Sequence, residues 1–147
     1  MRKIYDNILS MEIKFMQLAL ELAQKAAKRG EVPIGAVIVH EGKVIAKATN
    51  KRERSRSALW HAEMLAIAKA CKRLKNWRLT GCDMYVTLEP CEMCLGAARN
   101  ARIRHVYYGA PTENLTLNHE LEMTGGILAT ESSSILKNFF QSRRNSK

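Results

Sequence analysis

The chain has 147 residues, of which 46% are hydrophobic and 26% charged, as in an ordinary globular domain. This composition excludes a largely disordered chain, no apolar run is long enough to span a bilayer, and without a secretory signal we expect a cytoplasmic protein. The formal net charge of +10 favours a polyanionic partner such as nucleic acid, with a solvated basic surface as the plainer alternative.

Hydrophobic periodicity predicts the elements in chain order. We expect residues 1–9 to be a loose lead-in to a helix that Ser10 caps and Gly30 ends. A β-branched run over 33–40 and a second one over 43–48, joined by a Glu41-Gly42 turn, predict a hairpin. Later segments predict a loop over 51–57, helices over 58–74, 91–101 and 127–143, strands over 83–88, 104–108 and 120–123, and a loop over 111–119.

Strands that alternate with helices after an initial hairpin are typical of an α/β domain. We therefore expect a three-layer α/β/α architecture with a mixed central sheet. Neither an internal repeat nor a low-complexity linker divides the sequence, so residues 1–147 are assigned to a single domain.

Two short segments carry side chains that are typical of a metal site. His61 and Glu63 stand at the start of one expected helix, and Cys91 and Cys94 open the next, directly after Pro90. A helical first turn places the two sulfurs on one face, and a helix N-terminus favours the thiolate form. One imidazole and two thiolates predict one Zn²⁺ per chain with a fourth position left for water. Glu63, which is not a ligand in this scheme, would move the protons as the catalytic residue.

Other interpretations of the cysteine pair are weaker. A structural zinc site needs a fourth ligand, and the remaining histidines and cysteines show no recognisable ligand spacing. A redox centre would not explain His61 or Glu63. Cys71 lies on an apolar helix stripe and Cys82 precedes a strand, so we expect both to be inert core residues.

His-x-Glu followed by Pro-Cys-x-x-Cys is the signature of zinc nucleobase deaminases. With Asn50, the run 87–94 and Tyr108-Gly109-Ala110, the chain resembles bacterial tRNA-specific adenosine deaminases of the cytidine deaminase-like superfamily, from about Met11 to Arg144. The resemblance implies hydrolytic deamination of adenosine to inosine at the wobble position of a tRNA anticodon. It also implies a homodimer.

The resemblance further implies substrate contacts. Ile34 would wall the adenine pocket, Asn50 would hold the ribose, and backbone amides around Leu88 and Glu89 would orient the base. The last helix would contact the tRNA anticodon loop through three residues: Phe140, Arg143 and Arg144.

The sequence is compatible with other substrates and with one role outside catalysis. The segment 110–117 is shorter than the loop usual in the family, so other single-stranded nucleic acid, including DNA, is a possible substrate. A free base or nucleoside of the guanine or cytidine type is another. Outside the enzyme class, the chain could be a non-catalytic zinc-containing RNA-binding subunit. The basic surplus favours a polymeric substrate, and Glu63 favours an enzyme.

Overall fold

The computed structural model describes residues 2–112 and 120–145, so most of the loop predicted over 111–119 lies outside the described residues. The elements in chain order are α1 (Arg2–Lys28), β1 (Gly35–His40), β2 (Lys43–Thr49), α2 (Arg52–Ser55), α3 (Ala62–Leu74), β3 (Cys82–Leu88), α4 (Glu92–Asn100), β4 (His105–Ala110), β5 (Glu122–Thr124) and α5 (Ala129–Asn145). Across these described segments, we find no helix with the length and apolar character needed to cross a membrane.

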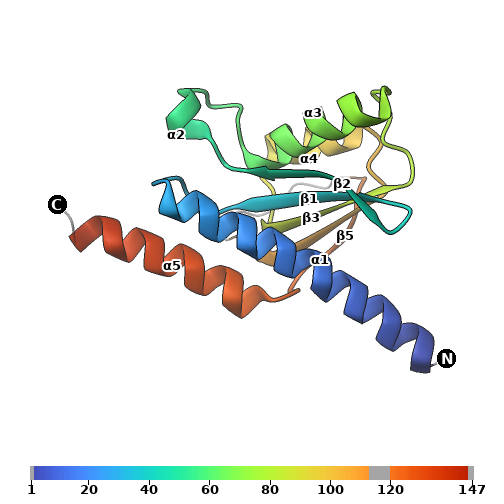
Figure 1. Ribbon diagram of the computed structural model, residues 1–147, viewed down its shortest axis with the longest axis horizontal. Coiled ribbons are helices and arrows are strands. Elements are labelled where there is room, and N and C mark those ends of the chain that lie inside the picture. The colour runs from blue at the N-terminus through green and yellow to red at the C-terminus, as the bar shows by residue number, and fades with distance from the viewer. Residues whose placement is uncertain (1, 113–119, 146–147) are drawn as a thin grey trace.

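The strands form one five-stranded sheet in the order β2-β1-β3-β4-β5. β1 pairs antiparallel with both β2 and β3, whereas β3, β4 and β5 run parallel to one another. Helices α1 and α5 cover one face of the sheet, and α3 and α4 cover the other (Figure 1). The predicted three-layer α/β/α class with a mixed sheet is confirmed.

Side chains that alternate along the strands build a separate core on each face. Ile38 and Val86 belong to the cluster that packs with α3 and α4, whereas their neighbours Val37 and Tyr85 pack with Phe15 of α1. This is the period of two that a strand imposes on its side chains. The expected turn between β1 and β2 is also confirmed, because Glu41 and Gly42 have φ angles of 51° and 74°.

Gly35, the first residue of β1, lets α1 approach the sheet closely. A Cβ atom at this position would lie 2.1 Å from the backbone oxygen of Ala19 and 2.8 Å from the Cβ atom of Leu22. Only hydrogen fits in that space, so glycine sets the distance between α1 and the sheet.

Two local predictions are wrong. The first helix begins at Arg2 rather than at Ser10, so residues 2–9 are helical and not a loose lead-in. Glycine and proline are absent before Ser10, and Ile4 and Ile8 continue the helical spacing, so nothing in the sequence stops the helix there. The stretch 51–57, expected as a loop, contains the short helix α2.

Candidate active site

The predicted metal ligands meet where β3 ends and two helices begin. His61 is the residue immediately before α3, Cys91 is the residue immediately before α4, and Cys94 lies in the first turn of α4. Helices α3 and α4 lie on the same face of the sheet (Figure 1). The fold therefore brings together the starts of two helices that 30 residues of chain separate.

The extended backbone of His61 explains how His61 and Glu63 can face the same cavity although they are only two residues apart. Residues two apart on a helix point to different sides. His61, however, has φ −68° and ψ 153°, so it precedes the helix and its side chain does not follow helical spacing. Glu63 is inside the first turn of α3. This junction allows both side chains to face one cavity.

The three donor atoms have the separations of a tetrahedral zinc site. His61 Nδ1 lies 3.6 Å from Cys91 Sγ and 3.5 Å from Cys94 Sγ, and all three donors lie within 4.8 Å of one another. Zinc bonds of about 2.3 Å to sulfur and about 2.1 Å to nitrogen at a tetrahedral angle place such N and S ligands about 3.6 Å apart. The residues present therefore fit one zinc ion.

Burial and the neighbouring groups also favour a bound cation at the cluster of His61, Cys91 and Cys94. Burial raises the pKa of the Cys94 thiol, and the nearby Glu63 and Cys91 raise it further. A thiolate there needs a positive charge beside it, which a divalent metal supplies. Burial lowers the pKa of His61, and the Arg52 guanidinium lowers it further, so the imidazole is held in the neutral form that binds metals.

Glu63 is a buried carboxyl group with unused hydrogen-bonding capacity. It is 4% exposed, and its Oε1 atom has no hydrogen-bond partner among the described residues. Burial raises the pKa of this carboxyl, although its own backbone amide and the Cys94 thiol oppose the rise. A buried oxygen without a protein partner beside a metal-ligand cluster is available to exchange protons with a bound water or substrate.

A cavity of about 710 Å³ opens over this cluster. Its lining includes His61, Glu63 and Cys91 and three of the predicted substrate contacts: Ile34, Leu88 and Glu89. The Glu89 carboxylate also accepts the backbone N–H of Thr112 at 3.1 Å, so it holds the start of the segment after β4 against the cavity. This volume is in the range of small-molecule and nucleotide pockets.

Asn50 is not part of the cavity lining, and its side chain joins two segments behind the wall. It is 3% exposed, its Nδ2 donates to the carbonyl of Val32 at 3.5 Å, and its Oδ1 accepts the N–H of Arg52 at 3.4 Å. The described contacts thus place Asn50 in the support of the cavity rather than on its surface.

The three predicted contacts near the C-terminus lie on α5, on the other face of the sheet from α3 and α4 (Figure 1). Phe140 is 43% exposed and Arg144 is exposed. Arg143 donates a hydrogen bond to the carbonyl of Gly30, and its guanidinium lies 4.8 Å from the centre of the Phe139 ring. None of these side chains lines the cavity that contains Glu63.

Some cavity residues were not expected from the sequence. Arg52 and Thr112 line the cavity but lie in segments expected as loops and were given no role in the site. Glu92 and Met93, between the two cysteines, also line it and were expected in the helix over 91–101, without a role. The basic run beginning at Lys51 marks Arg52 as part of a cationic segment in the sequence, but the position of Arg52 beside the ligands depends on the tertiary fold.

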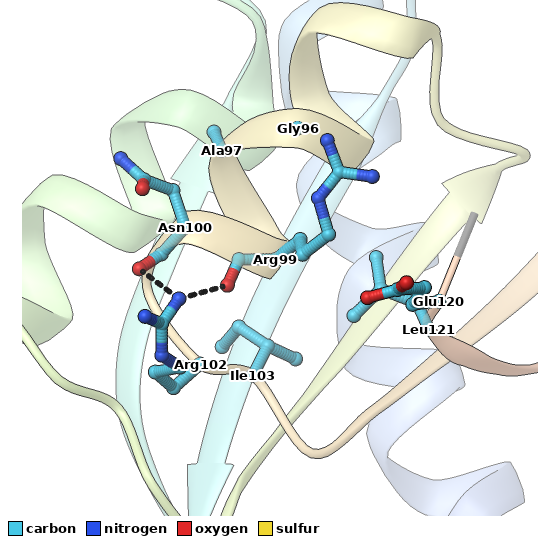
Figure 2. A pocket seen from close by; sticks show the side chains of 8 residues that line it. All are labelled: Gly96, Ala97, Arg99, Asn100, Arg102, Ile103, Glu120 and Leu121. Atoms are coloured by element: carbon cyan, nitrogen blue, oxygen red, sulfur yellow. Dashed lines mark hydrogen bonds between the residues drawn. The ribbon is translucent and has the colours of Figure 1, made fainter.

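A second cavity, of about 700 Å³, lies at the opposite end of α4 (Figure 2). The Arg102 guanidinium donates to the carbonyls of Arg99 and Asn100 at 3.1 and 3.3 Å and so caps the last turn of that helix. The described lining contains no histidine or cysteine, and its one carboxylate is that of Glu120. The cavity over His61 is therefore the one equipped for metal chemistry.

Comparisons with known proteins agree with this geometry. Residues 9–110 match the family described as the cytidine and deoxycytidylate deaminase zinc-binding region. The chain is 43% identical to the tRNA-specific adenosine deaminase of Bacillus subtilis (strain 168), over 90% of this chain and 91% of that protein.

Two solved structures extend the likeness to three dimensions. One, from a study of A-to-I editing by tRNA:A34 deaminases, has a TM-score of 0.78 and 42% identity and covers 84% of this chain and 99% of that chain. The other, a guanine deaminase from Bacillus subtilis, has a TM-score of 0.66 and 32% identity and covers 90% of this chain and 92% of that chain. With the family match and the zinc-ligand cluster, these likenesses show that the chain belongs to the zinc-dependent cytidine and deoxycytidylate deaminase family and is a hydrolytic deaminase.

Proposed function

We propose that this enzyme converts adenosine to inosine at the wobble position of a tRNA anticodon. The observation that carries the proposal is the cavity in which Glu63 faces the His61–Cys91–Cys94 cluster, in a chain 43% identical to a tRNA-specific adenosine deaminase. The net charge of +10 suits a polyanionic substrate. A free base carries no phosphate and makes no use of this charge.

His61, Cys91 and Cys94 would hold the zinc ion, whose Lewis acidity makes a water molecule nucleophilic near neutral pH. Glu63 would carry one proton of the attacking water to N1 of adenine and the other to the 6-amino group, while the water oxygen bonds to C6. The bond between C6 and the amino nitrogen would then break, so that ammonia leaves and the C6 carbonyl of inosine remains.

The substrate contacts are assigned by position. Ile34, Leu88 and Glu89 wall the cavity that would receive the flipped adenine. Asn50, whose side chain bonds Val32 and the Arg52 amide, would position the wall near the ribose rather than contact the ribose itself. The exposed end of α5, with Phe140, Arg143 and Arg144, would bind the anticodon loop outside the cavity. We also propose that the enzyme is a cytoplasmic homodimer, as the place of tRNA modification and the family resemblance imply.

Product analysis tests the proposal directly. The zinc-loaded protein is incubated with an anticodon stem-loop carrying adenosine at the wobble position, and in parallel with free adenosine, guanine and cytidine. Mass spectrometry of the digested RNA should show inosine at that position, and the Glu63→Gln variant should produce none. Turnover of a free base or nucleoside alone would contradict the tRNA substrate. Binding of the stem-loop without any deamination would support the non-catalytic subunit.

A further inference from the structure

The helix α2 lies beside the active-site cavity, yet its own residues do little to hold it there. It has four residues, none of them buried, and Lys51 at its N-terminal end makes no side-chain cap. Helices this short are unstable in isolation. The like charges of Lys51, Arg52, Arg54 and Arg56 oppose its compact form, with Glu53 as the one acidic residue of the segment. A contact from outside α2 must therefore hold this helix in its position.

The Glu31 carboxylate supplies that fixed point. Its Oε1 atom accepts the backbone N–H of Arg54 at 2.7 Å, and its Oε2 atom accepts that of Glu53 at 3.2 Å. These are N–H groups of the first turn, which have no partner within the helix. Glu31 therefore acts as an N-cap from more than 20 residues away, and its negative charge faces the positive end of the helix dipole.

Glu31 is itself held rigidly. It is 2% exposed and follows Gly30, whose φ of 80° ends α1. The N–H of Gly30 donates to the carbonyl of Ala27, and that of Glu31 donates to the carbonyl of Ala26, both at 3.0 Å. This is a Schellman motif, in which the residue after the glycine is fixed by the helix that it leaves. The carboxylate is thus anchored to α1.

The same tether reaches the cavity wall. Arg52, in the first turn of α2, and Ile34, three residues after Glu31, both line the cavity. Between them, the N–H of Asn50 donates to the carbonyl of Ile34 at 3.2 Å, and the Asn50 side chain accepts the N–H of Arg52. The segments 31–34 and 50–54 are therefore joined at both ends, and each contributes one residue, Ile34 or Arg52, to the cavity lining.

We propose that Glu31 is a positioning residue that holds the cationic segment 51–56 at the mouth of the active-site cavity, where this segment receives the phosphodiester backbone of the RNA. The inference rests on the proposed function. Its two parts are the tether, which is a property of the free protein, and the effect of the tether on RNA binding. Each part has a measurement of its own.

Amide hydrogen exchange measures the tether. In Glu31→Ala both acceptors are lost, so exchange of the Glu53 and Arg54 amides should accelerate by about tenfold or more, and in Glu31→Gln, which keeps one acceptor oxygen, by less. Glu21→Gln, an exposed change on α1, is the matched control and should leave both amides unchanged. Unchanged exchange in Glu31→Ala would overturn the tether.

Kinetics on the stem-loop RNA measure the consequence. In Glu31→Gln the KM should rise about tenfold while kcat and zinc content stay within about twofold of the wild type, because only binding at the mouth is weakened. A general loss of structure would instead lower kcat and zinc content together. In an Arg52→Gln background, most of the effect of Glu31→Gln on KM should disappear, because Glu31 affects RNA binding by positioning Arg52.

Failure of this inference can be told apart from failure of the proposed function. If the wild-type enzyme makes no inosine, the proposed function is wrong. The dissociation constant of the same RNA is then measured in place of KM for Glu31→Gln, Arg52→Gln and the double variant. If Glu31→Gln accelerates amide exchange but leaves KM, or the dissociation constant, unchanged, the positioning role is wrong whatever reaction the enzyme catalyses.

Discussion

The Nδ1 atom of His61 lies 3.6 Å from the Sγ atom of Cys91, although 30 residues separate them in the chain. Each of the two residues immediately precedes a helix and has an extended backbone. An extended residue at a helix start can turn its side chain toward a neighbouring helix start. Two such junctions side by side therefore make a ligand pair that neither helix could make alone.

Removing one thiol should remove the metal. In Cys91→Ala, zinc should fall from about one ion per chain to a small fraction, because two donors bind the ion far more weakly than three. Cys91 is exposed, so its loss should disturb packing little. Cys71→Ala, which alters a free cysteine outside the cluster, is the control and should keep its zinc. Elemental analysis of the purified variants checks this, and a full complement of zinc in Cys91→Ala would refute the ligand assignment.

Glu63→Gln should separate zinc binding from catalysis. The amide occupies the same volume but cannot carry a proton between the water and the base, so kcat should fall by at least about 100-fold. Zinc content should stay near that of the wild type, because Glu63 is not one of the three donors. The exposed change Glu21→Gln is the control for both measurements. Substantial activity in Glu63→Gln would exclude this carboxyl as the proton carrier.

The chemistry of the site was predictable because it is encoded in short-range pattern. The spacing of Cys91 and Cys94 and the neighbouring His61 and Glu63 define a donor set before any fold is known. The strand order could not be read this way, but the alternation of strands and helices was sufficient for the class of fold. Ligand chemistry and element periodicity are local properties of a sequence.

What sequence analysis missed depends on tertiary contacts. The short helix α2 is capped by a distant carboxylate, and Glu31 gives no sign of this in the sequence. The face of α3 that is fully buried carries Ala62, Ala66 and Ala70, small residues that give a weak hydrophobic pattern. Trp77, although a large aromatic residue, is 52% exposed, with the Arg78 guanidinium 4.2 Å from its ring centre.

Adding one methyl group at each of two glycines should have opposite effects on stability. In Gly35→Ala the new Cβ would meet the backbone oxygen of Ala19 at 2.1 Å, and backbone cannot move aside as a flexible side chain can. The free energy of unfolding should fall by about 3 kcal/mol. In Gly96→Ala, inside α4, the new Cβ meets nothing within 4 Å. The better helix propensity of alanine should therefore raise the free energy of unfolding by about 0.5–1 kcal/mol.

Denaturant unfolding of the zinc-loaded proteins at equal metal concentration checks the pair. Holding the metal constant matters because zinc binding adds to the apparent stability. If Gly35→Ala unfolds at the same denaturant concentration as the wild type, the close approach of α1 to the sheet does not constrain the fold.

The two arginines at the end of α5 should differ in what their removal changes. Arg144 is exposed, and in Arg144→Ala the slope of log K against log salt for stem-loop RNA should become shallower by about 1, with little change in stability. Arg143 also bonds the Gly30 carbonyl and packs on the Phe139 ring, so Arg143→Ala should lower the unfolding temperature as well. Fluorescence anisotropy over a salt series measures the slopes. Lys14→Ala, an exposed change on α1, controls for the loss of one positive charge, and an Arg144→Ala slope equal to that of the wild type would remove α5 from the RNA interface.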